Sequence, residues 1–347
     1  MNVISSRTYR DQIRKLTKLI PSREFTVLVT GASGLVGSCL VDTFLTAEQT
    51  LENKIKVIAL GRDEVKLKNR FNYAEKKQVD YIAQDIMLPL ALNTPIDYIV
   101  HTASYADPLS YSQFPSETLL TSVIGTRNIL DYCKKYKNTR LLFTSSFEAY
   151  GKIEKRDIYI ESDSGEIDLN AIRSCYPEGK RCAEILIRCY KKEYDIDFVI
   201  SRLCSVYGPT MSKNDNKAHA QFIRDGLSGK KIILKSKCDQ KRTYCYLMDI
   251  VSGLLTVLFN GKSGEVYNIS NENGVARISD VARFIAEICN TEVCFCTANE
   301  TEQQMFSRPQ NCILDNQKLR DLGWKGEYSL YDGLFSTISI LKELQSY

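Results

Sequence analysis

The stretch Phe25-Thr26-Val27-Leu28-Val29-Thr30-Gly31-Ala32-Ser33-Gly34-Leu35-Val36-Gly37 decides the fold of this chain. A short β-rich run ends in Gly-x-x-Gly-x-x-Gly and continues into 38–45, a segment with helical periodicity. Glycines at 31, 34 and 37 allow a tight turn, the approach of backbone N–H groups to a pyrophosphate, and close packing of helix on strand. The order strand, turn, helix therefore predicts a dinucleotide-binding unit.

Strand-like and helical runs alternate from this turn onward. The expected strands are 25–30, 55–60, 80–83, 97–101, 139–145 and 197–202, and the expected helices are 34–46, 63–77, 115–136 and 176–194. Alternation of this kind predicts an α/β fold, a Rossmann-like doubly wound parallel sheet with helices on both faces.

Three regions are expected along the chain. Residues 1–24 form an amphipathic helix, since Tyr9, Ile13, Leu16 and Ile20 follow helical spacing. Residues 25–207 form the dinucleotide-binding domain. Residues 208–347 form a smaller mixed α/β substrate-binding region, partly interleaved with that domain, with helices at 278–289 and 330–344.

Composition limits the class of protein. The 347 residues, 44% of them hydrophobic, can bury a sizeable core. A formal charge of +4 on 46 basic and 42 acidic residues is too mild and too mixed for nucleic acid or a membrane as the main partner, but it suits an anionic nucleotide. No apolar run approaches the roughly 18 residues that a bilayer span needs. A cytoplasmic location is expected.

The twelve cysteines lack any Cys-x-x-Cys pair, and the chain has only two histidines. Reduced, mostly buried thiols are expected, with neither disulfides nor a metal site. Cys175, Cys182 and Cys189 recur every seven residues and are interpreted as small packing residues. Cys294 and Cys296, on a strand-like run, are interpreted in the same way.

Two further segments carry chemistry. In Ser174-Cys175-Tyr176-Pro177-Glu178-Gly179-Lys180-Arg181, a phenol lies one helical turn from an ammonium group. The cation is expected to lower the pKa of Tyr176 from about 10, giving a base usable near neutral pH. The apolar run from 140 ends in Thr144-Ser145-Ser146, and ligands bind at the carboxyl ends of parallel strands, so Ser146 is expected to face a ligand.

Together these residues resemble the extended short-chain dehydrogenase/reductases, in particular the NAD-dependent epimerase/dehydratases that act on nucleotide sugars. The resemblance runs from about residue 25 to the C-terminus. Its motifs are 30–37, Gln84-Asp85-Ile86, His101-Thr102-Ala103-Ser104, Gly125-Thr126-Arg127-Asn128, Thr144-Ser145-Ser146, Tyr176-x-x-x-Lys180, Arg202-Leu203 with Tyr207-Gly208-Pro209, and Arg242 before Tyr246-Leu247-Met248-Asp249. Residues 173–181 look most like UDP-glucuronate decarboxylases and related capsule or O-antigen sugar enzymes.

The resemblance implies a cofactor site. Its expected residues are Gly31, Ser33, Gly34, Leu35, Val36, Gly37, Asp85, Ile86, Thr102, Ala103, Ser104, Tyr176 and Lys180. The acid that usually holds the ribose at the end of the second strand is missing, and Arg62 follows Gly61 instead. Arg62 could pair with a 2′-phosphate or stack on adenine, and Asp63 could supply the acid. NAD is favoured by the resemblance, and NADP stays open.

The implied mechanism begins with removal of the proton of the sugar 4-hydroxyl by Tyr176, while hydride leaves C4 for the nicotinamide. Ser146 would hydrogen-bond the same oxygen, and Lys180 would bind the nicotinamide ribose. From the resulting 4-ketone the outcome can be epimerisation, loss of water or loss of a carboxylate.

Several residues depart from the family pattern. Phe147 replaces the Asp of dTDP-glucose-type dehydratases, while Glu148, a further candidate catalytic residue, remains. Arg308-Pro309 approaches the decarboxylase motif Arg-x-Pro-Asp, but Asp315 is displaced from it. Ser122 and Ser205 stand where relatives have Asn. Arg242 matches the arginine that contacts the diphosphate, so Ser205 and Arg242 are the expected substrate-binding residues.

Epimerase and decarboxylase outcomes both stay open. The alternatives are an NADPH-dependent 4-ketosugar reductase, favoured by Arg62, and a non-catalytic nucleotide-binding scaffold, which would not need Ser146, Tyr176 and Lys180. A homodimer is expected, because relatives pair two helices across a two-fold axis and each helix here offers two apolar stripes. On the first helix, one stripe consists of Val123, Leu130 and Cys133, and the other of Ile129, Tyr132 and Tyr136. On the second helix, one stripe consists of Ala183, Leu186, Ile187 and Tyr190, and the other of Cys182, Ile185 and Cys189.

Overall fold

A seven-stranded parallel sheet forms the centre of the computed structural model, which describes residues 2–50, 54–75, 77–154, 156–235, 239–297 and 310–344. The strand order is β11-β7-β5-β4-β1-β2-β3. The strands are β1 (Phe25–Thr30), β2 (Ile55–Gly61), β3 (Val79–Ala83), β4 (Tyr98–His101), β5 (Arg140–Ser146), β7 (Asp197–Leu203) and β11 (Val266–Ile269). The predicted doubly wound fold is confirmed. β11 was not predicted, because four residues that include Asn268 give no clear strand signal.

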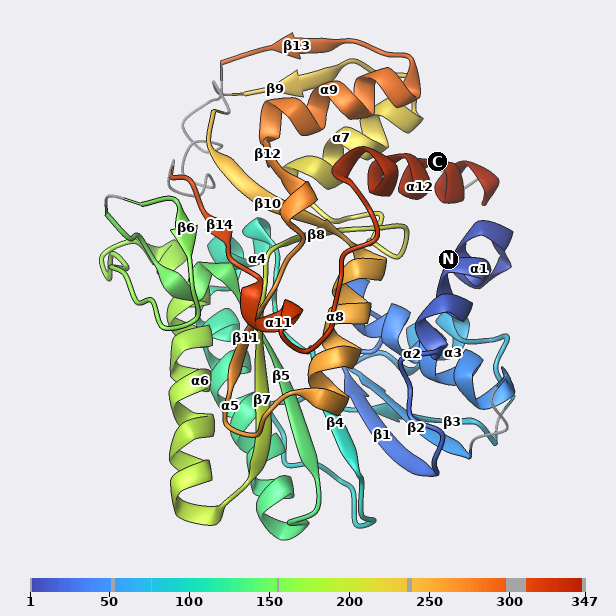
Figure 1. Ribbon diagram of the computed structural model, residues 1–347, viewed down its shortest axis with the longest axis vertical. Coiled ribbons are helices and arrows are strands. Elements are labelled where there is room, and N and C mark those ends of the chain that lie inside the picture. The colour runs from blue at the N-terminus through green and yellow to red at the C-terminus, as the bar shows by residue number, and fades with distance from the viewer. Residues whose placement is uncertain are drawn as a thin grey trace.

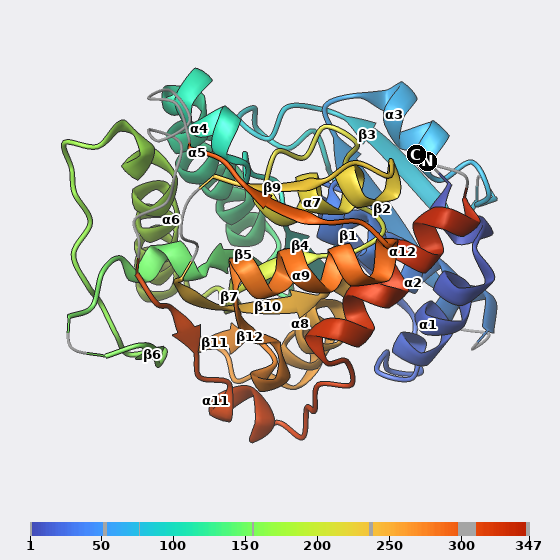
Figure 2. The same cartoon turned by 90° about the horizontal axis from the view of Figure 1, so that it is seen from above.

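Helices cover both faces of this sheet (Figure 1, Figure 2). α5 (Pro115–Lys135) and α6 (Cys175–Tyr194) lie on one face, and α2 (Leu35–Thr50) and α8 (Leu247–Asn260) on the other. Alternating side chains of β1 pack into the hydrophobic cores on the two faces of the sheet. Val27 and Val29 belong to the core under α2 and α8, and Leu28 belongs to the core under α5 and α6. Burial on both faces explains why the strand reads as a continuous apolar run.

α3 (Glu64–Arg70) is shorter than the expected helix at 63–77. The side chain of Asp63 accepts a hydrogen bond from the Lys66 N–H at 2.9 Å and so caps its start. Phe71 is fully buried, and the hydroxyl of Tyr73 donates to Asp42 of α2. These tertiary contacts turn the chain away from the helix axis.

The N-terminal segment packs against α2. It contains η1 (Val3–Ser5) and α1 (Arg7–Thr17), whose Tyr9 donates a hydrogen bond of 2.7 Å to buried Asp42. The hydroxyls of Ser6 and Thr8 each donate to Glu343, at the end of α12 (Leu330–Glu343), at 2.6 Å. The two ends of the described chain therefore lie side by side (Figure 2).

Smaller sheets and helices stand above the carboxyl edge of the large sheet (Figure 1). They comprise α7 (Ala218–Leu227), α9 (Ile278–Cys289), β8 (Ser205–Tyr207), β10 (Lys241–Tyr246), β12 (Val275–Arg277), the pair β9 (Ile232–Leu234) and β13 (Val293–Phe295), and the pair β6 (Ile158–Tyr159) and β14 (Ile313–Leu314). Short elements are α4 (Pro108–Gln113), η2 (Phe147–Tyr150), η3 (Ile172–Ser174), η4 (Glu272–Gly274) and α11 (Gln317–Arg320). The expected division of the chain at 207 and 208 stays a prediction.

The eleven described cysteines are all free. Cys182, Cys189 and Cys296 are exposed and Cys175 and Cys294 half-buried, so the interpretation of Cys182, Cys189 and Cys296 as buried packing residues is wrong within a single chain. The described residues contain no group of three or more His, Cys, Asp or Glu side chains suited to a metal ion.

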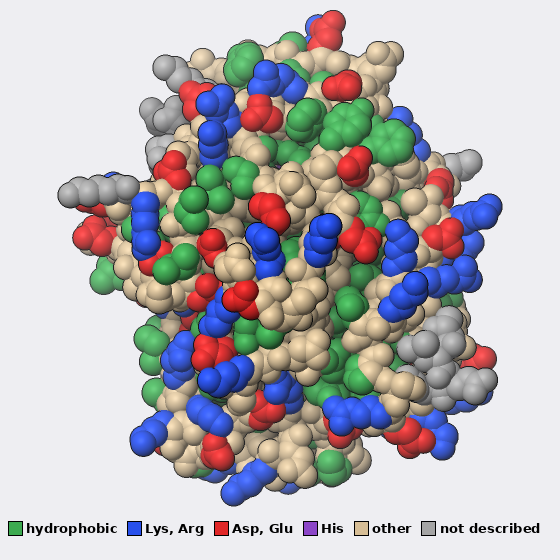
Figure 3. All heavy atoms as spheres, viewed as in Figure 1, with side chains coloured by type: hydrophobic (Ala, Val, Ile, Leu, Met, Phe, Trp, Pro, Cys, Tyr) green, Lys and Arg blue, Asp and Glu red, His purple; other side chains and the backbone are tan. Residues whose placement is uncertain are grey.

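Charged side chains of both signs are interspersed over the face shown in Figure 3. This agrees with the mixed charge of the sequence. No helix in the described ranges is long and apolar enough to cross a membrane.

Candidate active site

The glycine turn between β1 and α2 is packed too tightly for side chains. Gly31 has a φ of +65°, and a Cβ there would lie 2.9 Å from the backbone of Ala103. A Cβ at Gly37 would lie 2.4 Å from the Gly31 carbonyl oxygen and 2.9 Å from Thr102 Oγ1. Bare backbone thus lines the turn at the start of α2, an arrangement that fits a dinucleotide pyrophosphate. Ser33, Gly34, Leu35 and Val36 belong to the same turn and first helical residues.

The predicted residues after β3 and β4 flank this turn. Thr102 Oγ1 donates to the Thr30 carbonyl at 2.6 Å, and the Ala103 N–H donates to Thr30 Oγ1 at 3.2 Å. Ser104 follows on the same loop. Asp85 accepts a hydrogen bond from the Met87 N–H at 2.9 Å, and Ile86 is buried beneath Gly125 of α5. The segments predicted to hold the cofactor thus meet at the carboxyl edge of the sheet.

Arg62, at the end of β2, contacts Tyr105 of the loop after β4. Its guanidinium carbon lies 4.8 Å from the centre of the Tyr105 ring, and it donates a hydrogen bond to the Tyr105 hydroxyl. Asp63 accepts a hydrogen bond at Oδ1 as the cap of α3, and its role as the ribose acid stays a prediction.

If Arg62 pairs with a 2′-phosphate, Arg62→Ala should weaken NADP binding by about 1.5 to 3 kcal/mol, the usual contribution of a hydrogen bond to a charged group, and change NAD binding little. Calorimetric titration with each dinucleotide measures both. Tyr105→Phe is the companion variant, because it releases Arg62 and should not weaken NADP binding. Equal losses for both cofactors would show that Arg62 only stacks on adenine.

The candidate catalytic residues come from β5 and α6. Ser146 ends β5, and its hydroxyl accepts a hydrogen bond of 3.2 Å from the Glu148 N–H. Tyr176 and Lys180 lie on the buried side of α6, with relative exposures of 7% and 3%. Lys180 Nζ donates to the Thr144 carbonyl of β5 at 2.9 Å and lies 5.9 Å from the centre of the Tyr176 ring.

The ionisation of Tyr176 differs from the expectation drawn from the sequence. Burial, and next the charge of Glu148, raise the pKa of Tyr176 to about 12, against hydrogen bonds with Ser146 and Tyr111. Burial also lowers the pKa of Lys180 to about 8, against the opposing charge of Glu184. The ammonium is directed at the Thr144 carbonyl, so desolvation of the phenol outweighs the benefit of the cation.

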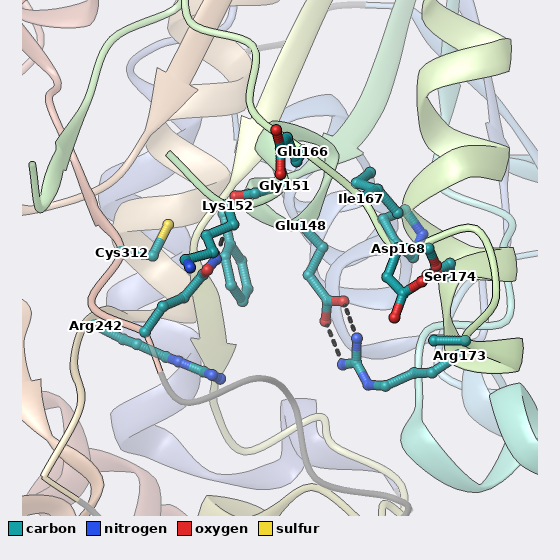
Figure 4. Close-up of a pocket in the computed structure, with 14 residues that line it drawn as sticks. Glu148, Gly151, Lys152, Glu166, Ile167, Asp168, Arg173, Ser174, Arg242 and Cys312 are labelled. Carbon is teal, nitrogen blue, oxygen red and sulfur yellow. Dashed lines mark hydrogen bonds and ion pairs between the residues drawn. The ribbon is translucent and has the colours of Figure 1, made fainter. Parts of the chain in front are cut away.

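Glu148 borders a cavity of about 180 Å³ (Figure 4). The lining residues are Phe147, Glu148, Gly151, Lys152, Glu166, Ile167, Asp168, Ala171, Arg173, Ser174, Pro177, Arg242, Gln310 and Cys312. Glu148 accepts two hydrogen bonds from Arg173, 2.6 Å from Nη1 and 2.9 Å from Nη2. Ser146 and Tyr176 are not among the described residues that line the cavity, but their sequence neighbours Phe147 and Pro177 are.

Of the two predicted substrate-binding residues, Arg242 lines this cavity. It comes from β10 on the side opposite Arg173, and its guanidinium carbon lies 5.8 Å from the centre of the Phe147 ring (Figure 4). Ser205 lies on β8, which pairs with β10, and it is not among the described residues that line the cavity.

Two departures from the family pattern, at Ser122 and Asp315, have a structural account. Ser122 is buried, and a Cβ added at Gly179 would lie 3.2 Å from the Cβ of Ser122. Ser122 therefore packs against the backbone of α6. Asp315 accepts a hydrogen bond of 2.9 Å from the Gln317 N–H at the start of α11, outside the cavity. Arg308 and Pro309 lie outside the described residues.

Arg173 and Tyr111 were not singled out as functional by the sequence. Tyr111 of α4 stacks on Tyr176, with ring centres 4.6 Å apart and ring planes at 19°. Arg173 was visible only as part of the motif preceding Tyr176. Its partner Glu148 is 25 residues away in the chain, and residue spacing over that range carries no contact signal.

Comparisons with known proteins show the family of the chain. The family model described as "NAD dependent epimerase/dehydratase family" matches residues 27–270. UDP-glucuronic acid decarboxylase 6 of Arabidopsis thaliana is 31% identical over 309 residues, which cover 89% of this chain and 86% of that protein. UDP-glucuronic acid decarboxylase 1 of Xenopus tropicalis is 30% identical over 334 residues, which cover 92% of this chain and 73% of that protein.

Solved structures share the fold. A dTDP-glucose 4,6-dehydratase from Streptomyces venezuelae with NAD and TYD bound superposes with a TM-score of 0.78 at 24% identity, covering 92% of this chain and 97% of that one. A UDP-glucuronic acid 4-epimerase from Bacillus cereus in complex with UDP-glucuronic acid and NAD gives 0.75 at 24% identity, covering 92% and 99%.

Proposed function

The chain belongs to the NAD-dependent epimerase/dehydratase family, and within it we propose an enzyme that oxidises C4 of a nucleotide-activated sugar. The observation that carries this proposal is the convergence of Ser146, Tyr176 and Lys180, buried at the carboxyl edge of the sheet. Ser146 orients the 4-hydroxyl, Tyr176 accepts its proton, and Lys180 binds the nicotinamide ribose. The turn from Gly31 to Gly37 would hold NAD, which would supply the hydride acceptor and whose positively charged nicotinamide would favour the phenolate.

We propose decarboxylation of a UDP-hexuronate as the outcome at the 4-ketone stage. The likeness to UDP-glucuronic acid decarboxylases at 30–31% identity supports this choice. Phe147 in place of an acid argues against the proton relay that loss of water requires. Epimerisation at C4 is the second candidate, because it needs only the three residues that orient and deprotonate the hydroxyl. We place the activity in the cytoplasm, in the synthesis of sugars for surface polysaccharides.

Mass spectrometry of nucleotide sugars incubated with the enzyme and either NAD or NADP tests the proposal. Loss of carbon dioxide from UDP-glucuronate supports decarboxylation, and a change of retention without a change of mass supports epimerisation. Loss of water, or reduction of a 4-ketosugar with NADPH, would replace the proposal by a dehydratase or a reductase. Cofactor binding without conversion of any sugar in the panel would favour the alternative of a non-catalytic nucleotide-binding scaffold.

We further propose a homodimer formed through α5 and α6. Ile185 of α6 is 62% exposed, and Cys182 and Cys189 beside it are exposed. These three residues form the second stripe expected on that helix. On α5, in contrast, Ile129 and Tyr132 are buried together with Leu130 and Cys133 of the first stripe, so the expectation of a second free stripe is wrong for that helix. An exposed apolar stripe on a long helix is typical of a helix that pairs with another.

We expect Ile185→Lys to convert a dimer into a species near the 39.5 kDa monomer mass at micromolar concentration, because an ammonium group would be buried in the interface. Sedimentation velocity measures the change. Phe335→Lys on α12, where the native side chain is 54% exposed, is the matched control and should remain dimeric. A wild-type protein that sediments as a monomer at every concentration would exclude the dimer.

A further inference from the structure

Arg173 forms a two-point ion pair with Glu148 at the wall of the cavity (Figure 4). The two side chains are 24% and 16% exposed, so the pair is largely shielded from water. In the described part of the chain, the hydrogen bonds to both carboxylate oxygens of Glu148 come from Arg173. Its geometry is that of a fork against a carboxylate, the arrangement in which arginine fixes the orientation of an acid.

Arg173 also supports the ring that covers Tyr176. The guanidinium carbon of Arg173 lies 5.5 Å from the centre of the Tyr111 ring, and Tyr111 stacks on Tyr176 at 4.6 Å. Arg173 itself is fixed, because η3 precedes α6 directly and the Ser174 hydroxyl donates to the Asp168 carbonyl at 2.5 Å. One guanidinium thus contacts Glu148 directly and reaches Tyr176 through Tyr111.

Five groups face Tyr176 from the elements packed around it. They are Ser146 at the end of β5, Glu148 of η2, Tyr111 of α4, Arg173 of η3 and Lys180 of α6 itself. Among them, the charge of Glu148 raises the pKa of Tyr176, and the charge of Arg173 lowers it. The ion pair therefore keeps a carboxylate beside the phenol, and the charge of Arg173 offsets part of the effect of that carboxylate on the Tyr176 pKa.

We propose that Arg173 is a positioning residue for the reaction, which holds Glu148 and the Tyr111 ring in place and offsets part of the charge of the carboxylate beside Tyr176. This inference rests on the proposed function, since it assumes that Tyr176 must lose its proton. It assigns Glu148 the role of a fixed hydrogen-bond acceptor toward the sugar, because the two-point contact with Arg173 fixes the orientation of both carboxylate oxygens.

The test compares the ionisation of Tyr176 in variants saturated with NAD. Carbon-13 at the ζ position of tyrosine reports the phenolate, and the Tyr176→Phe spectrum identifies the signal. We expect Arg173→Gln to move the titration midpoint of Tyr176 upward by roughly one pH unit, because an unpaired carboxylate is left nearby. Arg173→Lys should lie between Arg173→Gln and wild type. The double variant Glu148→Gln/Arg173→Gln should have a midpoint below that of Arg173→Gln and at or below that of wild type, because Glu148 raises the Tyr176 pKa more than Arg173 lowers it.

The pH dependence of turnover of UDP-glucuronate provides the second measurement. A base that must be deprotonated is less available when its pKa rises, so the rising limb of the Arg173→Gln profile should move to higher pH. At pH values on the rising limb, turnover of Arg173→Gln should be about tenfold lower than that of wild type for a displacement of one pH unit. Arg173→Lys should restore part of the loss.

Arg140→Gln is the matched control. It removes a partly buried arginine from its pair with Asp197 at 3.2 Å, at the opposite end of β5 and β7, and should leave the Tyr176 midpoint unchanged. The proposal would be overturned if Arg173→Gln had the same Tyr176 titration midpoint as wild type and the double variant had the same midpoint as Arg173→Gln. The titration requires no turnover, so it decides the role of Arg173 even where the sugar panel contradicts the proposed reaction. If Arg173→Gln does not fold, Arg173→Lys carries the same comparison.

Discussion

Replacement of Tyr176 by phenylalanine should lower turnover by about 10²- to 10⁴-fold, the usual contribution of a positioned acid or base. The hydroxyl is the group proposed to accept the proton of the sugar, and the phenyl ring of the variant keeps the packing against Tyr111. NAD binding should change little, because the pyrophosphate is proposed to lie on the turn from Gly31 to Gly37. Turnover and calorimetric NAD affinity, measured on the same preparation, separate the two effects.

Tyr207→Phe is a suitable control for this variant. Tyr207 is 1% exposed, and its hydroxyl donates to the Leu330 carbonyl at 3.2 Å, so its loss should cost about 1 kcal/mol of stability. Turnover should be retained. If Tyr176→Phe kept near-normal activity, Tyr176 could not be the base, and the mechanism would fail with it.

The sequence predicted the parts of the site that depend on neighbouring residues. Gly31, Gly34 and Gly37 are three apart and form one turn, and Tyr176 and Lys180 are one helical turn apart, so spacing alone indicates their arrangement. Six of the seven strands of the large sheet were predicted for the same reason, since most of them are apolar runs between turn residues, and β11 was missed.

The parts that depend on distant contacts were missed. Tyr111 and Tyr176 are 65 residues apart, and no periodicity shows that their rings stack. α8 was missed because it is buried on most sides and has no polar stripe to define a period. The pKa of Tyr176 was predicted in the wrong direction because sequence spacing shows the nearby cation but not the depth of burial, which here has the larger effect.

A methyl group added at Gly37 should weaken NAD binding by about 10- to 100-fold, equivalent to roughly 1.5 to 3 kcal/mol, the usual cost of overpacking a tight site. The new Cβ would lie 2.4 Å from the Gly31 carbonyl oxygen, a backbone atom that also accepts a hydrogen bond of 2.9 Å from the Gly34 N–H. Relief of the clash requires α2 to move away from the turn, which opens the surface proposed for the pyrophosphate. Calorimetric titration of Gly37→Ala with NAD measures the loss.

Gly229→Ala separates this effect from the general cost of replacing a glycine. Gly229 has a φ of +67°, but a Cβ there would meet no atom within 4 Å, so the variant carries about 1 to 2 kcal/mol of backbone strain and no clash. It should lower the melting temperature and leave NAD affinity unchanged. A folded Gly37→Ala protein that binds NAD as tightly as Gly229→Ala would mean that the turn does not hold the pyrophosphate. In that case the cofactor would have to be held by the loops after β3 and β4 alone.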